Sequence, residues 1–205
     1  MSLTTRDELR QLFGAASERA SLKEMSGLDP HAQQFIALSP FVVLASSNAA
    51  GQMDASPRGG EPGFVKVIDV QTLLIPDAPG NNRLDTLENI LDTGQLGLLF
   101  MLPGFDETLR VNGQATLSTE PSALQLCADA RRTPELVIRV RVQAVYLHCA
   151  KAFMRAQLWD PSRHVQRHLM PTMGEMLRDQ IQGTRGHRVE AETQEDMMAR
   201  YRQSL

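Results

Sequence analysis

Two long stretches of this chain alternate apolar and polar residues at every second position, and this alternation constrains the fold more than any other feature. The first runs from Leu109 to Leu117 and the second from Leu136 to His148. Successive side chains of a β-strand point to opposite faces of the sheet, so such alternation predicts strands with one buried face. A surface helix would instead place its apolar residues three or four positions apart. The chain is therefore predicted to be built around an antiparallel sheet.

Shorter runs, most of them apolar, predict the remaining strands, and the run 52–56 is expected as the return strand of a hairpin. These runs span residues 41–47, 52–56, 64–68, 72–76 and 96–102. The second run is expected to stop at Pro57, because proline has no N–H to donate to a neighbouring strand. The strands follow one another with few helices between them, which is not the order of a parallel doubly wound sheet. The pattern predicts a mainly β protein, a barrel of about six antiparallel strands with peripheral helices.

Helix-start signals place the predicted helices. Thr5 and Glu8 have the spacing of a capping box, and a short helix is expected from there to Gly14. Asp29 followed by Pro30 opens a second helix that runs to about residue 38. Apolar residues at helical spacing predict a third helix after residue 83, and a fourth is expected over about 121–130. After residue 159 the chain reads as helical and polar, with a loop at 183–187 and then either a final helix or a frayed tail.

The sequence thus divides into three predicted regions. Residues 1–39 are expected to form N-terminal helices that pack on the barrel, and residues 40–160 the barrel itself. Residues 161–205 are expected to form a C-terminal helical extension.

Charge and composition exclude several classes of protein. A net charge of -3 argues against a surface that coats nucleic acid, which needs a basic footprint. No apolar run approaches the roughly 20 residues that span a bilayer, and the charged start of the chain is unlike a signal peptide. The two cysteines, Cys127 and Cys149, are expected to be buried and inert, and their small number fits a reducing cytoplasm.

One pair of segments has the residue types of a phosphate site. Arg58 follows Ser56 by two positions and precedes glycines that allow close approach of a ligand to the backbone. Asn82 and Arg83 come at the predicted start of a helix, where free N–H groups and the helix dipole favour an anion. The alternative is a plain turn and N-cap, with Arg83 paired to Asp85 or Glu88 in solvent. Those two acidic residues would also compete with phosphate for the helix dipole.

A second spacing suggests a metal site only weakly. His164 and His168 are four positions apart, as two ligands on one helix would be, but no glutamate lies between them to act as a base. A pair of surface histidines is the favoured interpretation.

The order of several short motifs resembles one protein family. The motifs are Ser-Pro-Arg-Gly, Pro-Gly-Phe-Val, Leu-Leu-Ile-Pro-Asp, Gly-Asn-Asn-Arg, Gly-Leu-Leu-Phe and Leu-Arg-Val-Asn-Gly. In this order they closely resemble the pyridoxamine 5′-phosphate oxidase-related split-barrel proteins that bind flavin mononucleotide (FMN). The resemblance runs from about Pro40 to Trp159, and its most specific part is residues 54–115.

The resemblance implies a homodimeric split barrel with FMN in a cleft between the two chains. It implies that Asn82, Arg83 and Lys66 hold the phosphate end, and that Ser56 and Arg58 lie along the flavin or its phosphate. It also implies that the backbone of Ile75 and Pro76 faces the flavin ring and that Trp159 brings an aromatic ring over it, although a structural anchor is an equal alternative for Trp159. His148 and Cys149, at a strand end, are expected to face the core in preference to the flavin.

The activity implied is an FMN-dependent oxidoreductase that transfers hydride through flavin N5 to or from an unidentified small molecule. The end of the sequence, Arg200 to Leu205, lacks the arginine- and histidine-containing ending of the true pyridoxamine phosphate oxidases, so oxidation of vitamin B6 is not expected. The alternatives are a flavin- or haem-binding module without turnover and a deazaflavin-dependent reductase, because one fold can host several functions.

Overall fold

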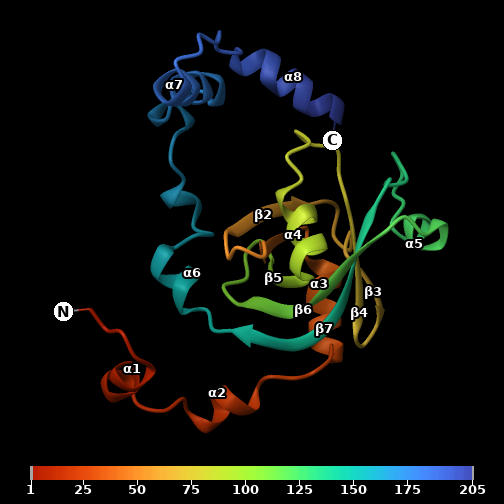
Figure 1. Ribbon diagram of the computed structural model, residues 1–205, viewed down its shortest axis with the longest axis vertical. Helices are drawn as coiled ribbons and strands as arrows, with labels where there is room; N and C mark the ends of the chain where they lie inside the picture. The colour runs from red at the N-terminus through yellow and green to blue at the C-terminus, as the bar shows by residue number, and fades with distance from the viewer. Residues whose placement is uncertain (1, 205) are drawn as a thin grey trace. The chain divides into compact units, whose positions relative to one another are not determined.

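The computed structural model describes residues 2–204, and the chain divides into one unit that ends at Trp159 and a second that begins at Asp160. The first unit contains a seven-stranded antiparallel sheet with the strand order β2-β1-β5-β6-β7-β4-β3 (Figure 1). The strands are β1 (Phe41–Ser47), β2 (Met53–Gly59), β3 (Lys66–Asp69), β4 (Thr72–Pro76), β5 (Gln95–Met101), β6 (Thr108–Ser118) and β7 (Val137–His148).

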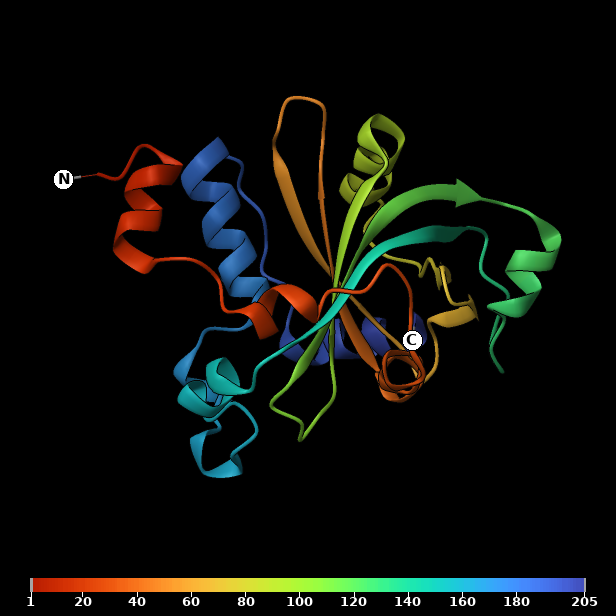
Figure 2. The same cartoon turned by 90° about the horizontal axis from the view of Figure 1, so that it is seen from below.

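The sheet is strongly curled, and the chain connection between its two edges requires this. A flat sheet would hold β2 and β3 roughly 29 Å apart, at about 4.8 Å per strand spacing. The segment that joins Gly59 to Lys66 spans at most about 25 Å even when fully extended, and a turn from Phe64 to Glu61 shortens it. The sheet therefore curves back toward itself without closing, and β2 and β3 border the gap (Figure 2). The predicted mainly β fold, a split barrel with peripheral helices, is confirmed, with seven strands in place of about six.

Alternate side chains of the strands form the core. Leu44 on β1, Leu98 on β5 and Val111 on β6 are cross-strand partners, and all three are buried in the larger hydrophobic cluster. A smaller cluster on the other face of the sheet contains Leu74 and Cys127. Because neighbouring residues of β4 enter different clusters, each cluster marks one face of the sheet.

The helices of the first unit lie around this sheet. They are α1 (Arg6–Phe13), α2 (Glu18–Leu22), α3 (Pro30–Leu38), α4 (Asp85–Thr93), α5 (Pro121–Leu126) and α6 (Lys151–Ala156). The predicted capping box of Thr5 and Glu8 is present, and the Asp29 side chain caps α3 as predicted. α3 buries Ala32 and Ile36 against the core. α2 buries no residue, so its sequence has no apolar stripe from which the helix could be predicted.

The second unit contains the 3₁₀ turns η1 (Pro161–Arg163) and η2 (Arg167–Leu169) and the helices α7 (Met173–Arg185) and α8 (Gln194–Ser204). The predicted loop at 183–187 begins too early, because α7 continues through Gly183 and ends at Gly186 in a left-handed conformation. The last stretch is a helix and not a frayed tail.

The predicted end of β2 is also wrong. β2 continues through Pro57 to Gly59. It is an edge strand with β1 as its one neighbour, so the missing N–H of Pro57 can point to the open side of the strand. Arg58 therefore lies within a strand and not beyond its end.

Candidate functional site

A polar cluster joins the middle of β2 to the first turn of α4. The Asp54 carboxylate accepts hydrogen bonds from the Ser56 hydroxyl, at 3.0 Å to each carboxylate oxygen, and from the Thr86 hydroxyl at 2.5 Å. Thr86 is buried, and Asp54 and Ser56 are half-buried. These bonds fix the beginning of α4 against the edge of the barrel.

Asp54, Ser56 and Arg58 lie on one face of β2, since they occupy alternate positions. Ser56 pairs with Leu44 and Arg58 pairs with Val42, so all three point to the side of the larger core cluster. Arg58 donates from Nη1 to the carbonyl oxygen of Pro57 at 3.0 Å. No carboxylate lies within salt-bridge distance of Arg58 in the described chain.

The segment before α4 has an unusual backbone. Asn82 has a φ of 57° and Leu84 a φ of 51°, and residues with side chains adopt this left-handed region at a cost. Leu84 is the N-cap of α4 and provides no side-chain hydrogen bond to the helix. The first turn of α4 therefore has N–H groups without a side-chain cap, which is the arrangement that binds anions at helix N-termini. Asn82 and Arg83 precede the helix, which begins at Asp85 and not directly after residue 83.

Arg83 carries the principal cation of this segment. Its Nε lies 2.6 Å from Oδ2 of Asp85, and its side chain is 78% exposed. The hydrogen bond and charge of Asp85 raise the pKa of Arg83, and the charge of Asp54 adds to this effect. Arg83 thus lies within electrostatic range of the Asp54–Ser56–Thr86 cluster, and the pairing with Asp85 that the sequence left open is present.

Polar residues on α4 continue this attachment along β1. Nδ2 of the buried Asn89 donates to the Ser46 hydroxyl at 3.0 Å, and the Thr93 hydroxyl donates to the carbonyl oxygen of Ser47 at 2.9 Å. With Thr86, these residues form a polar stripe at helical spacing beside the apolar Ile90.

Asp54 and Thr86 are not among the site residues that the sequence predicts. Two signals could have identified them. Asp54 has the same period-two spacing from Ser56 as Arg58 has. Thr86, Asn89 and Thr93 repeat at helical spacing on the face that also carries Ile90.

Lys66, Ile75 and Pro76 form a separate group on β3 and β4. Lys66 pairs with Leu74, which belongs to the smaller cluster, so it lies on the opposite face of the sheet from Ser56 and Arg58. Its Nζ donates to the carbonyl oxygen of Gly63 at 2.8 Å. Ile75 is fully buried in the larger cluster, backbone included, whereas Pro76 is half-buried.

Trp159 has two partners inside the first unit. Its Nε1 donates to the carbonyl oxygen of Phe105 at 2.7 Å, and its ring centroid lies 5.7 Å from that of Phe153. These contacts hold the ring in place, as an anchor would.

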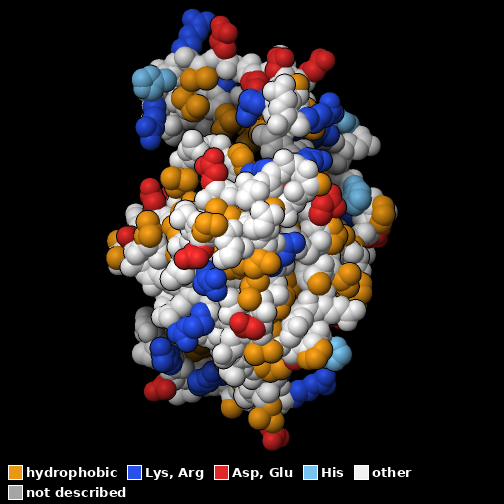
Figure 3. Space-filling view, turned by 90° about the vertical axis from the view of Figure 1, so that its right-hand side faces the viewer, with side chains coloured by type: hydrophobic (Ala, Val, Ile, Leu, Met, Phe, Trp, Pro, Cys, Tyr) orange, Lys and Arg blue, Asp and Glu red, His pale blue; other side chains and the backbone are white. Residues whose placement is uncertain are grey.

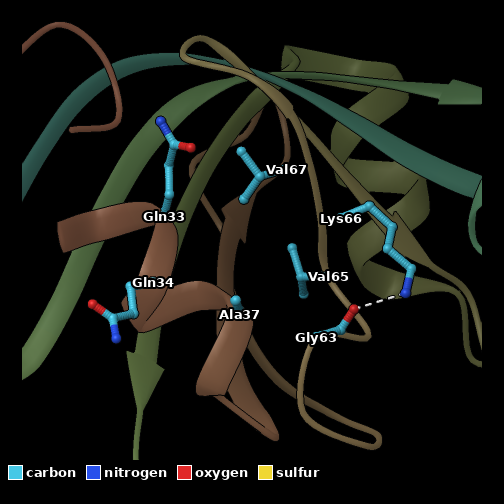
Figure 4. A pocket seen from close by; sticks show the side chains of 7 residues that line it. All are labelled: Gln33, Gln34, Ala37, Gly63, Val65, Lys66 and Val67. Carbon is cyan, nitrogen blue, oxygen red and sulfur yellow. Dashed lines mark hydrogen bonds between the residues drawn. The ribbon is translucent and has the colours of Figure 1, made fainter. Parts of the chain in front are cut away.

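A hollow in the surface lies away from the polar cluster between β2 and α4. It has a volume of about 440 Å³ between α3 and β3 and is open to solvent. Gln33, Ala37, Val65 and Lys66 are among the residues that line it, and the Lys66 side chain extends away from Gln33 toward Gly63 (Figure 4). Its lining has one cation, Lys66, whose Nζ already donates to Gly63, and no helix N-terminus, so we do not assign a phosphate site to it.

The structure differs from several smaller sequence predictions. Cys127 is buried as predicted, but Cys149 is exposed, and His148 is half-exposed and does not face the core. His164 and His168 do not share a helix, since His164 follows η1 in extended backbone. No cluster of three or more metal-ligating side chains exists among residues 2–204.

The curled, unclosed antiparallel sheet with peripheral helices places this chain among the split-barrel proteins. Residues 28–149 match the family model described as pyridoxamine 5′-phosphate oxidase. The chain therefore belongs to the pyridoxamine 5′-phosphate oxidase family. No curated protein matches the chain in sequence.

Two solved structures resemble parts of the chain. HupZ from Group A Streptococcus has 19% sequence identity and a TM-score of 0.48, and the match covers 58% of this chain and 91% of HupZ. An FMN-binding protein from Syntrophomonas wolfei has 13% identity and a TM-score of 0.46, and the match covers 70% of this chain and 94% of that protein.

The surface is mixed in character. On the face shown in Figure 3, Lys and Arg side chains are interspersed with Asp, Glu and hydrophobic side chains. Among the described residues, no helix has the length and apolar character needed to cross a membrane.

Proposed function

We propose that this protein is an FMN-dependent oxidoreductase whose phosphate site lies at the start of α4. Arg83, Asn82 and the uncapped N–H groups of the first turn of α4 hold the phosphate, and Arg58 approaches it from β2. When bound, FMN supplies hydride transfer through its N5 to or from a small molecule that is still unidentified. The side chains of this chain bind and orient the cofactor.

The observation that carries this proposal is the junction between β2 and α4. The hydrogen bond from Thr86 to Asp54 holds the uncapped helix start beside the strand face that carries Ser56 and Arg58. Two left-handed residues, Asn82 and Leu84, shape the backbone at the same place. Non-glycine residues in this conformation concentrate at ligand-binding segments, where the surrounding structure enforces the strain.

The residue types also fit a dianionic phosphate. Two arginines can offer bidentate hydrogen bonds, and only Arg83 of the two has a carboxylate partner in the described chain. Asp54 and Asp85 lower the net positive charge of the site, but Asp54 already accepts hydrogen bonds from the hydroxyl groups of Ser56 and Thr86. A phosphate would compete with Asp85 for Arg83.

The second group of residues suggests an assembly of two chains. Lys66 and Ser56 lie on opposite faces of the sheet, so one flat ligand cannot readily meet both side chains in a single chain. In a homodimer with the cofactor between the chains, Lys66 and the backbone of Pro76 belong to the same cofactor site as Ser56 and Arg83, and the buried Ile75 supports the strand beneath them. Trp159 is assigned to the rim of that site.

The test is an absorption titration of the purified protein with FMN, repeated with Arg83→Gln. The wild type should bind FMN in a saturable manner, and the variant should bind about tenfold more weakly, the effect of losing one charge-assisted contact. Arg178→Gln is the matched control, since Arg178 also pairs with a neighbouring carboxylate, Asp179, but lies in the second unit.

Two outcomes would contradict the proposal. One is a folded wild-type protein that ignores FMN, in which case the same titration with a deazaflavin and with haem identifies the cofactor class. The other is equal binding by wild type and Arg83→Gln, which would remove the phosphate from α4. Bleaching of bound FMN by reduced nicotinamide nucleotides separates an enzyme from a module that binds without turnover.

A further inference from the structure

Four side chains gather on the surface of β6 and β7, outside the site proposed above. Arg110 on β6 pairs with Tyr146 on β7, and Thr108 pairs with His148 two positions further on. The guanidinium carbon of Arg110 lies 5.6 Å from the centre of the Tyr146 ring, and Nζ of Lys23 lies 5.1 Å from it. The His148 ring centroid is 5.2 Å from that of Tyr146. Arg110 belongs to the Leu-Arg-Val-Asn-Gly motif, for which the proposed flavin site has no use.

Both cations are held in place by the backbone or by a neighbouring side chain. Met25 pairs with Val145 through two hydrogen bonds of 2.9 and 2.8 Å, which fixes the preceding segment beside β7. Nζ of Lys23 then donates to the carbonyl oxygen of Leu147 at 2.7 Å. Nε of Arg110 donates to Oδ1 of Asn112 at 3.2 Å.

The charges in this cluster are not balanced by the described chain. Neither Lys23 nor Arg110 has a carboxylate oxygen within 4.0 Å among residues 2–204. Burial lowers the pKa of His148, and the charges of Lys23 and Arg110 lower it further, so all three groups share one electrostatic environment. Lys23 lies beside one edge of β7 and Arg110 beside the other, with Tyr146 between them, and an anion that reaches both cations would balance their charge.

The hydrogen-bonding capacity points in the same direction. An ammonium group has three N–H donors and a guanidinium has five. The described chain provides one acceptor for Lys23 and one for Arg110. Most of the donors of both groups are therefore free to meet a ligand.

We propose that Lys23, Arg110, Tyr146 and His148 form a binding site for an oxyanion, namely the phosphate or carboxylate group of a small molecule. The Tyr146 ring forms a rigid support that fixes the two cations by cation–π contact. The guanidinium of Arg110 recognises two oxygens of the anion, and the ammonium of Lys23 binds as a point charge. This inference does not depend on flavin binding at α4.

The experiment is a titration of the full chain with inorganic phosphate at constant ionic strength, followed through the ring signals of His148 in NMR spectra. The His148 signals are assigned by their absence in His148→Gln. The wild type should show a saturable shift, and Arg110→Gln and Lys23→Gln should each bind phosphate about five- to tenfold more weakly. Both side chains are exposed, so both variants should keep the fold, which far-UV circular dichroism checks.

Two controls locate the effect. Arg139 lies on β7, as Tyr146 and His148 do, but about 20 Å from them, which is beyond the Debye length. Arg139→Gln therefore removes an equal charge and should leave the titration unchanged. Arg83→Gln removes the proposed flavin phosphate site and should also leave the His148 shift unchanged. A parallel titration with acetate shows whether phosphate or carboxylate binds more tightly. A shift that does not saturate, or one that Arg139→Gln weakens as much as Arg110→Gln, would overturn the proposal.

Discussion

The two cysteines differ in environment, and this difference predicts their reactivity. Cys127 is buried in the smaller hydrophobic cluster, and burial raises the pKa of its thiol, although Lys66 opposes this in part. Cys149 is exposed directly after β7. The thiolate is the reactive form, so at pH 8 a maleimide should label Cys149 quickly and Cys127 only slowly until the protein unfolds. Mass spectrometry of Cys149→Ser and Cys127→Ser measures each rate, and fast labelling of Cys127 in the folded protein would contradict the assignment.

At the same scale, the sequence could identify charged residues of the candidate site but not their partners. Arg58 and Arg83 could be chosen because an arginine beside glycines or at a helix start can bind a phosphate through two parallel hydrogen bonds. The spacing of Asp54 from Ser56 was visible in the sequence, but its bond to Thr86 was not, because the two residues are far apart along the chain. Cys149 was expected to be buried because free cysteines usually are, but it directly follows the end of β7 and is exposed.

Among the elements, the β6–β7 pair depends on one glycine. Gly113 follows a β-bulge, and a Cβ there would collide with the carbonyl oxygen of Arg141 on β7. Gly113→Ala should therefore lower the free energy of unfolding by about 1–3 kcal/mol, the usual cost of overpacking. Urea unfolding followed by the fluorescence of Trp159, which is in the same unit, measures this change.

A second glycine gives the matched control. Gly183 lies within α7 with no atom near the position of its missing Cβ, so Gly183→Ala should stabilise that helix by about 0.5–1 kcal/mol. If Gly113→Ala were as harmless as Gly183→Ala, the close approach of β6 and β7 at this point would be wrong.

Periodicity located most of the elements, whereas their ends depended on contacts outside each element. The alternation in β6 and β7 and the caps of α1 and α3 are local signals, and the structure reproduces them. The end of β2 cannot be predicted from local sequence. The strand continues through a proline, which is tolerated because β2 lies at an edge of the sheet. The start of α4 was placed too early because Leu84, an apolar residue in a left-handed conformation, replaces the expected polar cap.

At the scale of the whole molecule, hydrophobic burial is concentrated in the first unit. Both hydrophobic clusters consist of residues that precede Trp159, and among the described buried apolar residues only Met197 belongs to the second unit. Since burial of apolar surface is the main stabilising term, the first unit should fold without the second. Sequence periodicity did not show this, because α7 has an amphipathic pattern and a capping box like a core helix.

A chain that ends at Trp159 tests this division. It should unfold cooperatively with a midpoint within about 3 °C of the full chain, which corresponds to a stability change of about 1 kcal/mol. It should also bind FMN as the full chain does, because Ser56, Arg58 and Arg83 all precede the cut. The complementary peptide of residues 160–205 should show little helix in isolation, because its helices are short and have few buried contacts to stabilise them. Calorimetry and far-UV circular dichroism measure both fragments.

A truncated chain without cooperative unfolding would mean that the second unit supplies part of the core. Loss of FMN binding alone, with the fold intact, would instead assign part of the cofactor site to residues 160–205.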